Sequence, residues 1–409
     1  MERIQALLKL LGNPQQKLRF IHIGGTNGKG STAAFIASVL EKSGYRVGLY
    51  TSPYLLQFTN RMSINGSDIP PDRLSLLVKE LKPLVEKVTA KPYLGQPTEF
   101  EVVTALAFTY FAQEKPDVVV LEVGLGGRLD ATNVVNPLAC VLTTVALDHT
   151  QVLGPTLEDI AREKAGIIKE GVPVVTGVSQ PEALQVIKQA CLAKKTSLYI
   201  LGKDFSYLRS KVQKGKQVFY FQGLRDRLDS LEISLLGEHQ LSNASLALAC
   251  LELLKSDFKV TEESIRAGLR QASWPGRLEV MGEKPLVVLD GAHNVEAMLA
   301  LKKAVQDYFQ YERLILVLGI LGDKDIKNML QPVAPLAQKI IITAPENPRA
   351  AAPESVRDIL RPLFAGEILL EPKIEKAVEL ALSLASPQDM VLVAGSLYTI
   401  SSARSFLLL

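Results

Sequence analysis

The segment FIHIGGTNGKGS, residues 20–31, decides the fold of this chain. Its first four residues read as a buried strand, and the TAAFIASVLEKSG that follows it can form a helix. Between the two, glycines allow successive backbone N–H groups to turn toward one point ahead of the helix N-terminus. Strand, glycine loop and helix in this order predict a phosphate-binding turn in a parallel α/β sheet.

Two side chains of this loop suit a nucleoside triphosphate. Lys29 can neutralise β- and γ-phosphate oxygens, and Ser31 offers a hydroxyl group. The spacing differs from the usual GxxxxGK(S/T), because Gly30 separates the lysine from the hydroxyl. The alternative is a glycine turn in a packed α/β unit that binds nothing. We expect ATP to contact Gly25, Thr26, Asn27, Gly28, Lys29, Gly30 and Ser31.

Apolar runs along the chain predict two domains. With 409 residues, 47% of them hydrophobic, the chain can build two cores. Short runs alternate with amphipathic stretches, as in parallel strands joined by helices, at 20–23, 47–50, 118–123, 139–145 and 173–175. Polar–apolar alternation from about 198 to 236 predicts a small antiparallel sheet, and a helix is expected near 242–254.

The sequence WPGR at 274–277 contains two backbone punctuators and precedes a second strand–helix series. Its strands are expected near 285–289, 314–318, 339–343 and 390–394. We therefore predict a first domain over 1–273, a junction over 274–284 and a second α/β domain over 285–409.

Composition narrows the kind of partner and the compartment. Lys and Arg number 46 against 43 acidic residues, so the formal charge of +3 does not call for nucleic acid or a membrane surface. The amino terminus reads as an ordinary helix and not as a signal peptide, and no apolar run approaches the roughly 20 residues of a membrane span. The three cysteines, Cys140, Cys191 and Cys250, are odd in number and widely separated in the sequence. This favours reduced thiols and a cytoplasmic protein.

Two further residues suggest a metal site. Glu122 follows four apolar residues, and an ionised carboxylate there is costly unless a cation or a donor meets it. Phosphoryl transfer needs magnesium, which an acid at the end of a buried strand often holds. His149 follows the strand-like run TTVALD. This places it at the carboxyl end of a strand, beside the crevice in which open α/β sheets bind ligands. Alone it is better explained as a packing or loop histidine, and Glu122 together with the motifs described next reverses that preference.

Ten segments spread over nearly the whole chain resemble the Mur-ligase superfamily, and specifically its folylpolyglutamate synthase/dihydrofolate synthase branch. They are GTNGKGS (25–31), TSP (51–53), LEVGLGGRLDATN (121–133), ALDHTQVLG (146–154), IAREKAGIIK (160–169), GEHQLSNASLAL (237–248), WPGRLE (274–279), LDGAHN (289–294), PENPRA (345–350) and AGSLY (394–398). Cell-wall ligases usually carry Ser or Thr directly after the loop lysine, whereas the folate branch has glycine, as at Gly30. The resemblance implies an α/β fold with a P-loop-containing, Mur-ligase-like N-terminal domain, a small antiparallel sheet, and a second, Rossmann-like C-terminal domain.

The resemblance also implies a metal-binding set for two Mg²⁺ ions, made of Ser52, Glu122, His149 and Lys164. Lys164 is implied to be carbamylated. The chemistry is reasonable, because an ammonium group beside two cations would be repelled, whereas its CO₂ adduct supplies an anionic oxygen. From the residues alone, Lys164 reads as a solvated helix lysine.

Nucleotide contacts are implied for Asn243, Arg277 and Asp290, so that ATP touches both domains and domain closure accompanies its binding. Without the resemblance, Arg277 reads equally well as a surface or helix-cap arginine. His293 is implied to face the reaction centre and to orient or contact phosphate. Lys29, Lys164 and His293 form the expected catalytic set.

The pteroate part of the substrate is implied to contact Thr98, Phe100, Glu101, Leu129, Asp130 and Ala131. An aromatic ring near carboxylates suits a flat, hydrogen-bonding heterocycle. The sequence departs from the family pattern nearby. Tyr54 replaces the usual histidine after TSP, and Asn60 replaces the usual glutamate before Arg61. These changes leave open which folate form is used and whether both classical reactions occur.

The implied activity is ATP-dependent ligation of L-glutamate to dihydropteroate or a reduced folate, through an acyl phosphate, by a monomer. One alternative is a cell-wall ligase that adds an amino acid to a nucleotide-linked precursor. A second is a nucleotide-hydrolysing switch, for which GDKD at 322–325 is a weak candidate motif that more readily forms a turn. A third is a non-catalytic folate binder, which is expected to have lost Lys29, Glu122 or Lys164.

Overall fold

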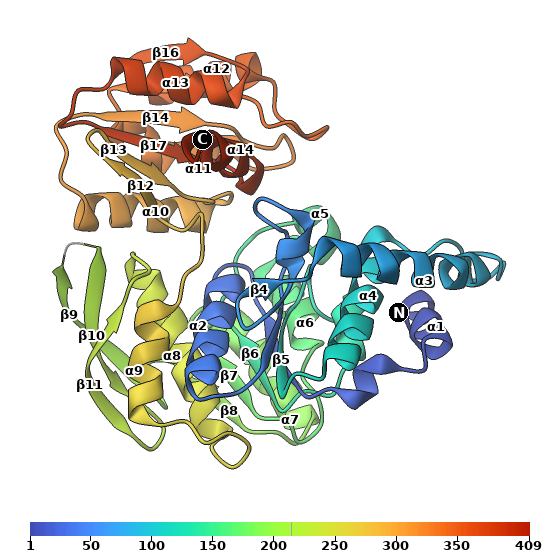
Figure 1. Ribbon diagram of the computed structural model, residues 1–409. Coiled ribbons are helices and arrows are strands. Elements are labelled where there is room, and N and C mark those ends of the chain that lie inside the picture. The colour runs from blue at the N-terminus through green and yellow to red at the C-terminus, as the bar shows by residue number, and fades with distance from the viewer. Residues whose placement is uncertain (214) are drawn as a thin grey trace. The chain divides into compact units, whose positions relative to one another are not determined.

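The computed structural model describes residues 1–213 and 215–409, which form two compact units (Figure 1). The first unit comprises Met1–Ser234 and Gln240–Ser273, and the second comprises Leu235–His239 and Trp274–Leu409. Each unit has its own sheet with helices around it. The predicted α/β class is confirmed.

The large sheet of the first unit has eight strands in the order β4-β3-β2-β5-β1-β6-β7-β8. Six strands run parallel, while β3 and β4 form an antiparallel edge. The central strands are buried along their whole length, because side chains on both faces are covered. The strands are β1 (Phe20–Gly24), β2 (Val47–Tyr50), β3 (Met62–Ile64), β4 (Ser67–Asp68), β5 (Val118–Glu122), β6 (Ala139–Leu142), β7 (Val174–Thr176) and β8 (Leu198–Ile200).

Two hydrophobic clusters lie against this sheet. One gathers apolar residues of α1, α3 and α4 around Phe108, and the other gathers those of α6 and α7 around Ile160. Helix α2 follows the glycine loop and packs against α9. The helices are α1 (Glu2–Leu10), α2 (Lys29–Lys42), α3 (Pro71–Thr89), α4 (Glu99–Glu114), α5 (Thr150–Leu153), α6 (Leu157–Ala165), α7 (Pro181–Ala193), α8 (Glu238–Leu253) and α9 (Glu262–Gln271), with 3-10 turns η1 (Pro14–Lys17), η2 (Phe58–Arg61) and η3 (Ala131–Val134).

The small antiparallel sheet is present, but it begins later than predicted. It consists of β9 (Ser206–Gln213), β10 (Lys216–Gln222) and β11 (Arg227–Ile233), and position 214 of the predicted stretch lies outside the described residues. Including the stretch from 198 was wrong, because β8 pairs in parallel with β7 at the edge of the large sheet. The helix expected near 242–254 begins earlier, at Glu238.

The second unit is built on a six-stranded sheet in the order β12-β13-β17-β14-β15-β16, in which only β12 pairs antiparallel. Strands occupy all four predicted positions. They are β12 (Glu279–Glu283), β13 (Leu286–Leu289), β14 (Leu314–Leu318), β15 (Lys339–Ile342), β16 (Glu367–Leu370) and β17 (Met390–Ala394). The helical segments are α10 (Val295–Tyr308), α11 (Ile326–Val333), η4 (Ala334–Leu336), α12 (Pro353–Leu360), η5 (Arg361–Leu363), α13 (Ile374–Leu384) and α14 (Leu397–Leu407).

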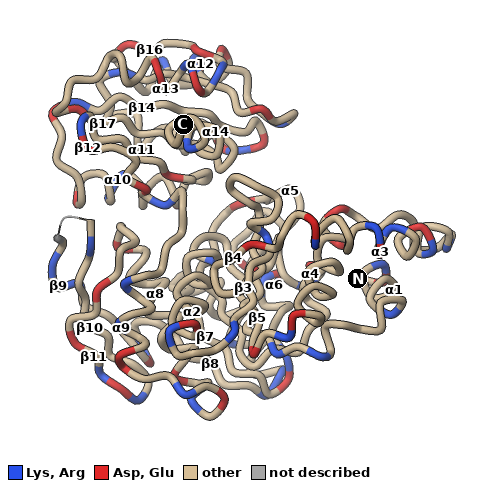
Figure 2. The backbone as a smooth tube through the Cα atoms, in the orientation of Figure 1, with Lys and Arg blue, Asp and Glu red and all other residues tan. Residues whose placement is uncertain are grey.

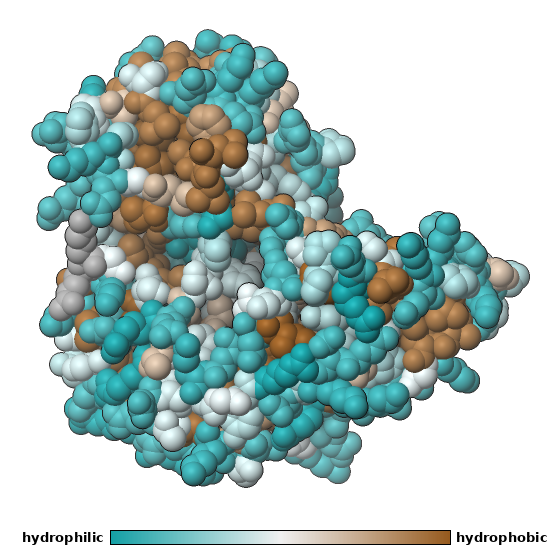
Figure 3. Space-filling model, viewed as in Figure 1, coloured by the Kyte–Doolittle hydropathy of each residue, from teal (hydrophilic) through white to brown (hydrophobic). Residues whose placement is uncertain are grey.

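Charged residues of both signs are interspersed along the chain (Figure 2). Hydrophilic and apolar side chains share the surface in view in Figure 3. Within the described residues, no helix is both long and apolar enough to span a bilayer. The GDKD segment forms a turn in which Lys324 N donates to Leu321 O over 3.3 Å, as predicted.

Candidate active site

The glycine loop between β1 and α2 has a backbone that only glycine fits at two points. Gly25 has φ +144°, and a Cβ there would lie 1.9 Å from Thr143 Oγ1. Gly28, which precedes the first residue of α2, has φ +87°, and its Cβ would lie 2.4 Å from Asn243 Oδ1. The glycines therefore permit both the left-handed backbone and the close approach of neighbouring segments.

The segment after β6 holds this loop by hydrogen bonds. Thr26 N donates to Thr144 O over 2.8 Å, and Asn27 N donates to Thr144 Oγ1 over 3.0 Å. Thr143 Oγ1 donates to Asn27 O over 2.6 Å. The loop is thus fixed in shape before any ligand arrives, which lowers the entropy cost of binding.

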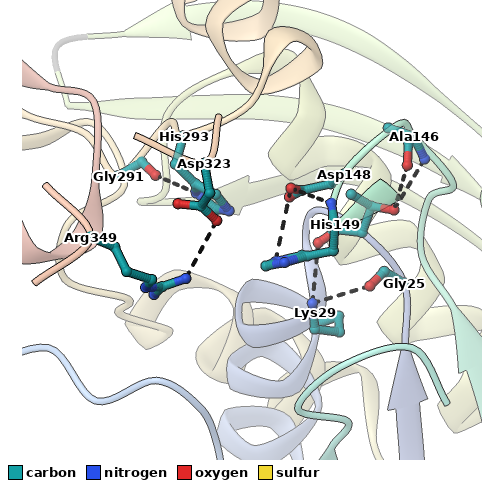
Figure 4. A network of polar contacts seen from close by, with 10 residues as sticks. Gly25, Lys29, Ala146, Asp148, His149, Gly291, His293, Asp323 and Arg349 are labelled. Atoms are coloured by element: carbon teal, nitrogen blue, oxygen red, sulfur yellow. Dashed lines mark hydrogen bonds and ion pairs between the residues drawn. The ribbon is translucent and has the colours of Figure 1, made fainter. Parts of the chain in front are cut away.

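Lys29 folds back over its own loop. Its Nζ donates to the carbonyl oxygens of Gly25 and Thr26, each over 3.1 Å (Figure 4). A cation is thereby held over the glycine turn at the N-terminus of a fourteen-residue helix. A phosphate bound at the glycine turn would lie next to this cation.

A buried amide pair orients the loop hydroxyl. Gln240 Nε2 donates to Ser31 Oγ over 3.2 Å, and Asn243 Nδ2 donates to Gln240 Oε1 over 2.9 Å. Ser31 Oγ accepts here, so its own proton remains available to another acceptor. Gln240 was not predicted from the sequence, although it stands three residues before Asn243 and therefore on the same face of α8.

Ser52 and Glu122 meet at the carboxyl ends of neighbouring strands. Tyr50 of β2 lies opposite Leu121 of β5, which brings the residues just beyond them together. Ser52 N donates to Glu122 Oε2 over 3.1 Å, and the buried Ser52 hydroxyl has no hydrogen-bond partner. An unsatisfied buried hydroxyl beside a carboxylate fits a site for a hard cation such as Mg²⁺.

Lys164 lies in the last turn of α6 and is only 4% exposed. Burial, together with the positive charge of Lys29, lowers the pKa of Lys164 to about 7, and the charge of Asp148 partly opposes this. The structure therefore brings Lys29, Lys164 and Asp148 within electrostatic range of one another. Asp148 was not predicted, although it lies in the ALDHTQVLG segment.

His149 stands beside Asp148 in a left-handed conformation, with φ +50°. Its backbone N donates to Asp148 Oδ1 over 2.9 Å, and its Nε2 lies 3.8 Å from the same oxygen (Figure 4). Among the described residues, no three His, Cys, Asp or Glu side chains gather in a metal-binding cluster. The predicted metal-binding set is not a cluster of this kind, because only two of its four members, Glu122 and His149, are His, Cys, Asp or Glu. The other two are Ser52 and Lys164.

Two of the residues expected to contact pteroate form a helix cap. Thr98 Oγ1 accepts from Glu101 N over 3.2 Å, and Glu101 Oε2 accepts from Thr98 N over 2.8 Å. Arg3 Nε also donates to Glu101 Oε2 over 2.8 Å. Burial acts to raise the pKa of Glu101, but these hydrogen bonds outweigh it and lower the pKa.

Asp130 organises the neighbouring loop. Its Oδ1 accepts from Thr132 N (2.9 Å) and Thr132 Oγ1 (2.6 Å), while its Oδ2 accepts from Leu125 N (2.9 Å). Ala131 is buried, whereas Leu129 is 62% exposed. The ring of Phe100 packs against the start of this loop, since a Cβ on Gly124 would lie 2.4 Å from its Cζ. The two predicted pteroate segments therefore adjoin each other.

The two departures from the family pattern lie in one segment. Asn60 Oδ1 accepts from Leu56 N (3.2 Å) and Gln57 N (2.8 Å), which closes the turn at η2. The Arg61 guanidinium carbon lies 5.2 Å from the centre of the Tyr54 ring, a cation–π contact. Tyr54 is 41% exposed.

Arg277, Asp290 and His293 belong to the second unit. Asp290 is 6% exposed, and its oxygens accept from Leu278 N and Ala292 N, each over 2.9 Å. Burial raises the pKa of Asp290, and the nearby Arg277 charge partly offsets the rise. His293 Nδ1 lies 2.9 Å from Gly291 O, and it donates this hydrogen bond because a carbonyl oxygen can only accept (Figure 4).

Comparison with known protein families identifies the class. The model of the Mur ligase middle domain matches residues 23–251, and that of the Mur ligase glutamate ligase domain matches residues 276–397. The chain therefore belongs to the Mur ligase family of ATP-dependent ligases.

More specific relatives place it within that family. It is 41% identical over 408 residues to the dihydrofolate synthase/folylpolyglutamate synthase of Bacillus subtilis, covering 98% of this chain and 93% of that protein. The folylpolyglutamate synthase of Lacticaseibacillus casei is 38% identical over 409 residues, with coverage of 99% and 94%. The chain belongs to the folylpolyglutamate synthase/dihydrofolate synthase branch, as its motifs suggested.

Solved structures agree. Mycobacterium tuberculosis folylpolyglutamate synthase, in a study of its complexes with ADP and AMPPCP, superposes with a TM-score of 0.95 at 34% identity, covering 99% of this chain and 95% of that one. E. coli FolC in complex with DHPP and ADP gives a TM-score of 0.89 at 32% identity, with coverage of 99% and 92%.

Proposed function

We propose that this chain joins L-glutamate to dihydropteroate, to a reduced folate, or to both, and converts ATP to ADP and phosphate. The observation that carries the proposal is the first-unit site. There Lys29 lies over the glycine turn, within electrostatic range of the buried Lys164. The Ser52–Glu122 pair lies at the carboxyl ends of the neighbouring strands β2 and β5. The ligands named for the relatives, ADP, AMPPCP and DHPP, support the same substrates.

The reaction would proceed in two displacements. An oxygen of the pteroate or folate carboxylate forms a bond to the γ-phosphorus while the bond from γ-phosphorus to the β–γ bridging oxygen breaks, which releases ADP and gives an acyl phosphate. The amine of glutamate then adds to the acyl carbon and loses a proton. The resulting tetrahedral intermediate expels phosphate and leaves an amide.

Residues of this chain supply the binding and the charge. Lys29 neutralises the transferring phosphate, and Ser31, oriented by Gln240, donates its proton to a phosphate oxygen. We propose that Asn243, Arg277 and Asp290 contact the nucleotide and that His293 orients the reacting phosphate. Exclusion of water protects the acyl phosphate from hydrolysis.

We propose that Ser52, Glu122, His149 and Lys164 hold two Mg²⁺ ions. The orphaned, buried Ser52 hydroxyl next to Glu122 supports this assignment. Magnesium, when bound, neutralises phosphate oxygens and polarises the γ-phosphorus.

Carbamylation of Lys164 fits the same site. A lysine at its ordinary pKa is neutral in about one molecule in several thousand at pH 7, whereas a pKa of about 7 leaves a large neutral fraction of Lys164. The neutral amine can attack CO₂, forming an N–C bond and releasing one proton, and the carbamate is an anionic oxygen ligand.

For the pteroate group we propose the region of Thr98, Phe100, Glu101, Leu129, Asp130 and Ala131. Within it, the side chains of Thr98, Glu101 and Asp130 accept hydrogen bonds from backbone N–H groups and so shape the backbone, and Phe100 contributes an aromatic ring that lies beside Tyr50. We further propose that the protein is a monomer. We also propose that it works in the cytoplasm, because Cys140, Cys191 and Cys250 are buried thiols without disulfides.

The test is direct. Purified full-length chain is incubated with ATP, Mg²⁺, L-glutamate and either dihydropteroate or tetrahydrofolate, and products are resolved by mass spectrometry. We expect one glutamyl adduct per ADP formed. ADP formation without an adduct would indicate a hydrolytic switch, and ligation only to a nucleotide-linked cell-wall precursor would assign the alternative ligase reaction.

A further inference from the structure

The backbone has a positive φ on both sides of Arg277, and it is strained at Leu278. Gly276 has φ +76° and Leu278 has φ +45°. Glycine adopts such angles readily, but leucine rarely does, because its Cβ crowds the following carbonyl. The turn that presents Arg277 therefore needs other interactions to hold it.

Two carboxylates hold the turn around Arg277 by accepting hydrogen bonds from its backbone. Glu279 Oε2 accepts from Gly276 N over 2.8 Å, and Asp290 Oδ2 accepts from Leu278 N over 2.9 Å. Gly291 N also donates to Gly276 O over 2.9 Å. The residues immediately before and after Arg277 are thus each tied by their backbone N–H to a side chain.

Glu279 is held in turn by Arg404 of α14. Arg404 Nε lies 2.9 Å from Oε1 and 3.0 Å from Oε2 of Glu279. Both side chains are largely shielded, with exposures of 16% and 21%. A shielded, charge-assisted pair is stronger than one in full solvent contact. Arg404 therefore restrains the carboxylate that caps the turn.

The guanidinium of Arg277 is closely packed between Gly276 and Gly291. Its Nη1 donates to Gly276 O over 3.2 Å, and a Cβ on Gly291 would come within 2.2 Å of the same nitrogen. A shift of the turn would move the guanidinium directly, because it bonds to the turn's own carbonyl.

We propose that Arg404 is a positioning residue for Arg277: acting through Glu279, it fixes the turn that presents the Arg277 guanidinium to the nucleotide. This inference rests on the proposed nucleotide contact of Arg277. Arg404 itself touches no substrate, and its effect is on the affinity for ATP.

The test is a double-mutant cycle in the full-length enzyme, with KM for ATP, kcat and thermal midpoint as readouts. We expect Arg404→Met to raise KM for ATP about five- to tenfold with little change in kcat, and Arg404→Lys to recover part of the loss. The Arg277→Ala/Arg404→Met double variant should have nearly the KM of Arg277→Ala alone. If Arg404→Met does not fold, Arg404→Lys and Glu279→Gln carry the same cycle.

Arg313→Met is the control, since it breaks a different arginine–carboxylate pair of the second unit, in which Arg313 Nε and Nη2 donate to the two oxygens of Asp389. It should lower the thermal midpoint without changing KM for ATP. If Arg404→Met behaves like this control, or if its effect multiplies with that of Arg277→Ala, the positioning role is wrong. If Arg277→Ala leaves KM for ATP unchanged, the proposed nucleotide contact itself fails.

Discussion

Ser52 donates its backbone N–H to Oε2 of Glu122 over 3.1 Å, while its own buried hydroxyl meets no partner. A buried, unsatisfied hydroxyl costs about 1–3 kcal/mol. A bound cation would remove this cost, since the hydroxyl oxygen would become a ligand.

We therefore predict opposite effects of Ser52→Ala on the free protein and on the metal complex. The free protein should be as stable as the wild type or slightly more so. Its thermal stabilisation by Mg²⁺ with AMPPCP should shrink, and the Mg²⁺ concentration for half-maximal activity should rise about tenfold. Loss of stability in the free protein with unchanged Mg²⁺ dependence would assign the hydroxyl a purely structural role.

Lys164 gives a pH-dependent prediction. Its pKa is about 7 in the folded protein against 10.5 ordinarily, so at pH below 7 the folded state carries the full cost of a buried charge. Stability should recover as pH rises from about 7 to 10.5, because there the unfolded chain binds the extra proton. In CO₂-free, Mg²⁺-free buffer, Lys164→Met should raise the thermal midpoint more at pH 6.5 than at pH 9.5. An equal gain at both values would show an ordinary lysine pKa.

The same residue should be needed for turnover. Lys164→Ala should lower ligation by at least about 100-fold, as for a lost metal ligand, and added short carboxylic acids should restore part of it by replacing the carbamate. Wild-type rates in the variant would remove Lys164 from the metal site.

Gln240 should affect the chemical step through Ser31. Gln240→Leu removes the donor to Ser31 Oγ and leaves Asn243 without its acceptor, so we expect kcat to fall about tenfold or more. Ser245→Ala is the matched control on the same helix, because that buried hydroxyl has no partner. Equal effects of the two changes on kcat would contradict the role of Gln240.

Gly28→Ala should damage nucleotide binding more than stability alone explains. The new Cβ would lie 2.4 Å from Asn243 Oδ1, so the loop and Asn243 must move apart. Gly44 has a similar φ of +89° but open space around it, so Gly44→Ala reports the backbone strain alone. By calorimetry, we expect ADP affinity to fall at least about tenfold for Gly28→Ala and to stay unchanged for Gly44→Ala.

Much of the fold was predictable because its central strands are continuous apolar runs. Val47–Tyr50 and Met390–Ala394 were predicted to the residue, since strands buried on both faces leave that pattern. The failure at Leu198–Ile200 has a physical reason. A short, half-buried edge strand carries too little pattern to reveal which sheet it joins.

The candidate site was predictable as motifs but not as contacts. The burial of Lys164 cannot be deduced from the polar IAREKAG segment around it, and only family resemblance singled it out. Gln240 and Arg404 act on residues 209 and 125 positions away, so no local pattern links each pair. The roles of Gln240 and Arg404 can be recognised only in the folded structure, where residues distant in the sequence are in contact.

In the proposed reaction, the substrate carboxylate is phosphorylated before glutamate adds to it. Dihydropteroate or the accepted folate, labelled with ¹⁸O in the reacting carboxylate, is turned over with ATP, Mg²⁺ and L-glutamate, and the inorganic phosphate is analysed by mass spectrometry. An acyl phosphate requires one ¹⁸O atom per phosphate released, in step with amide formation. Phosphate free of label, with amide still formed, would contradict the account.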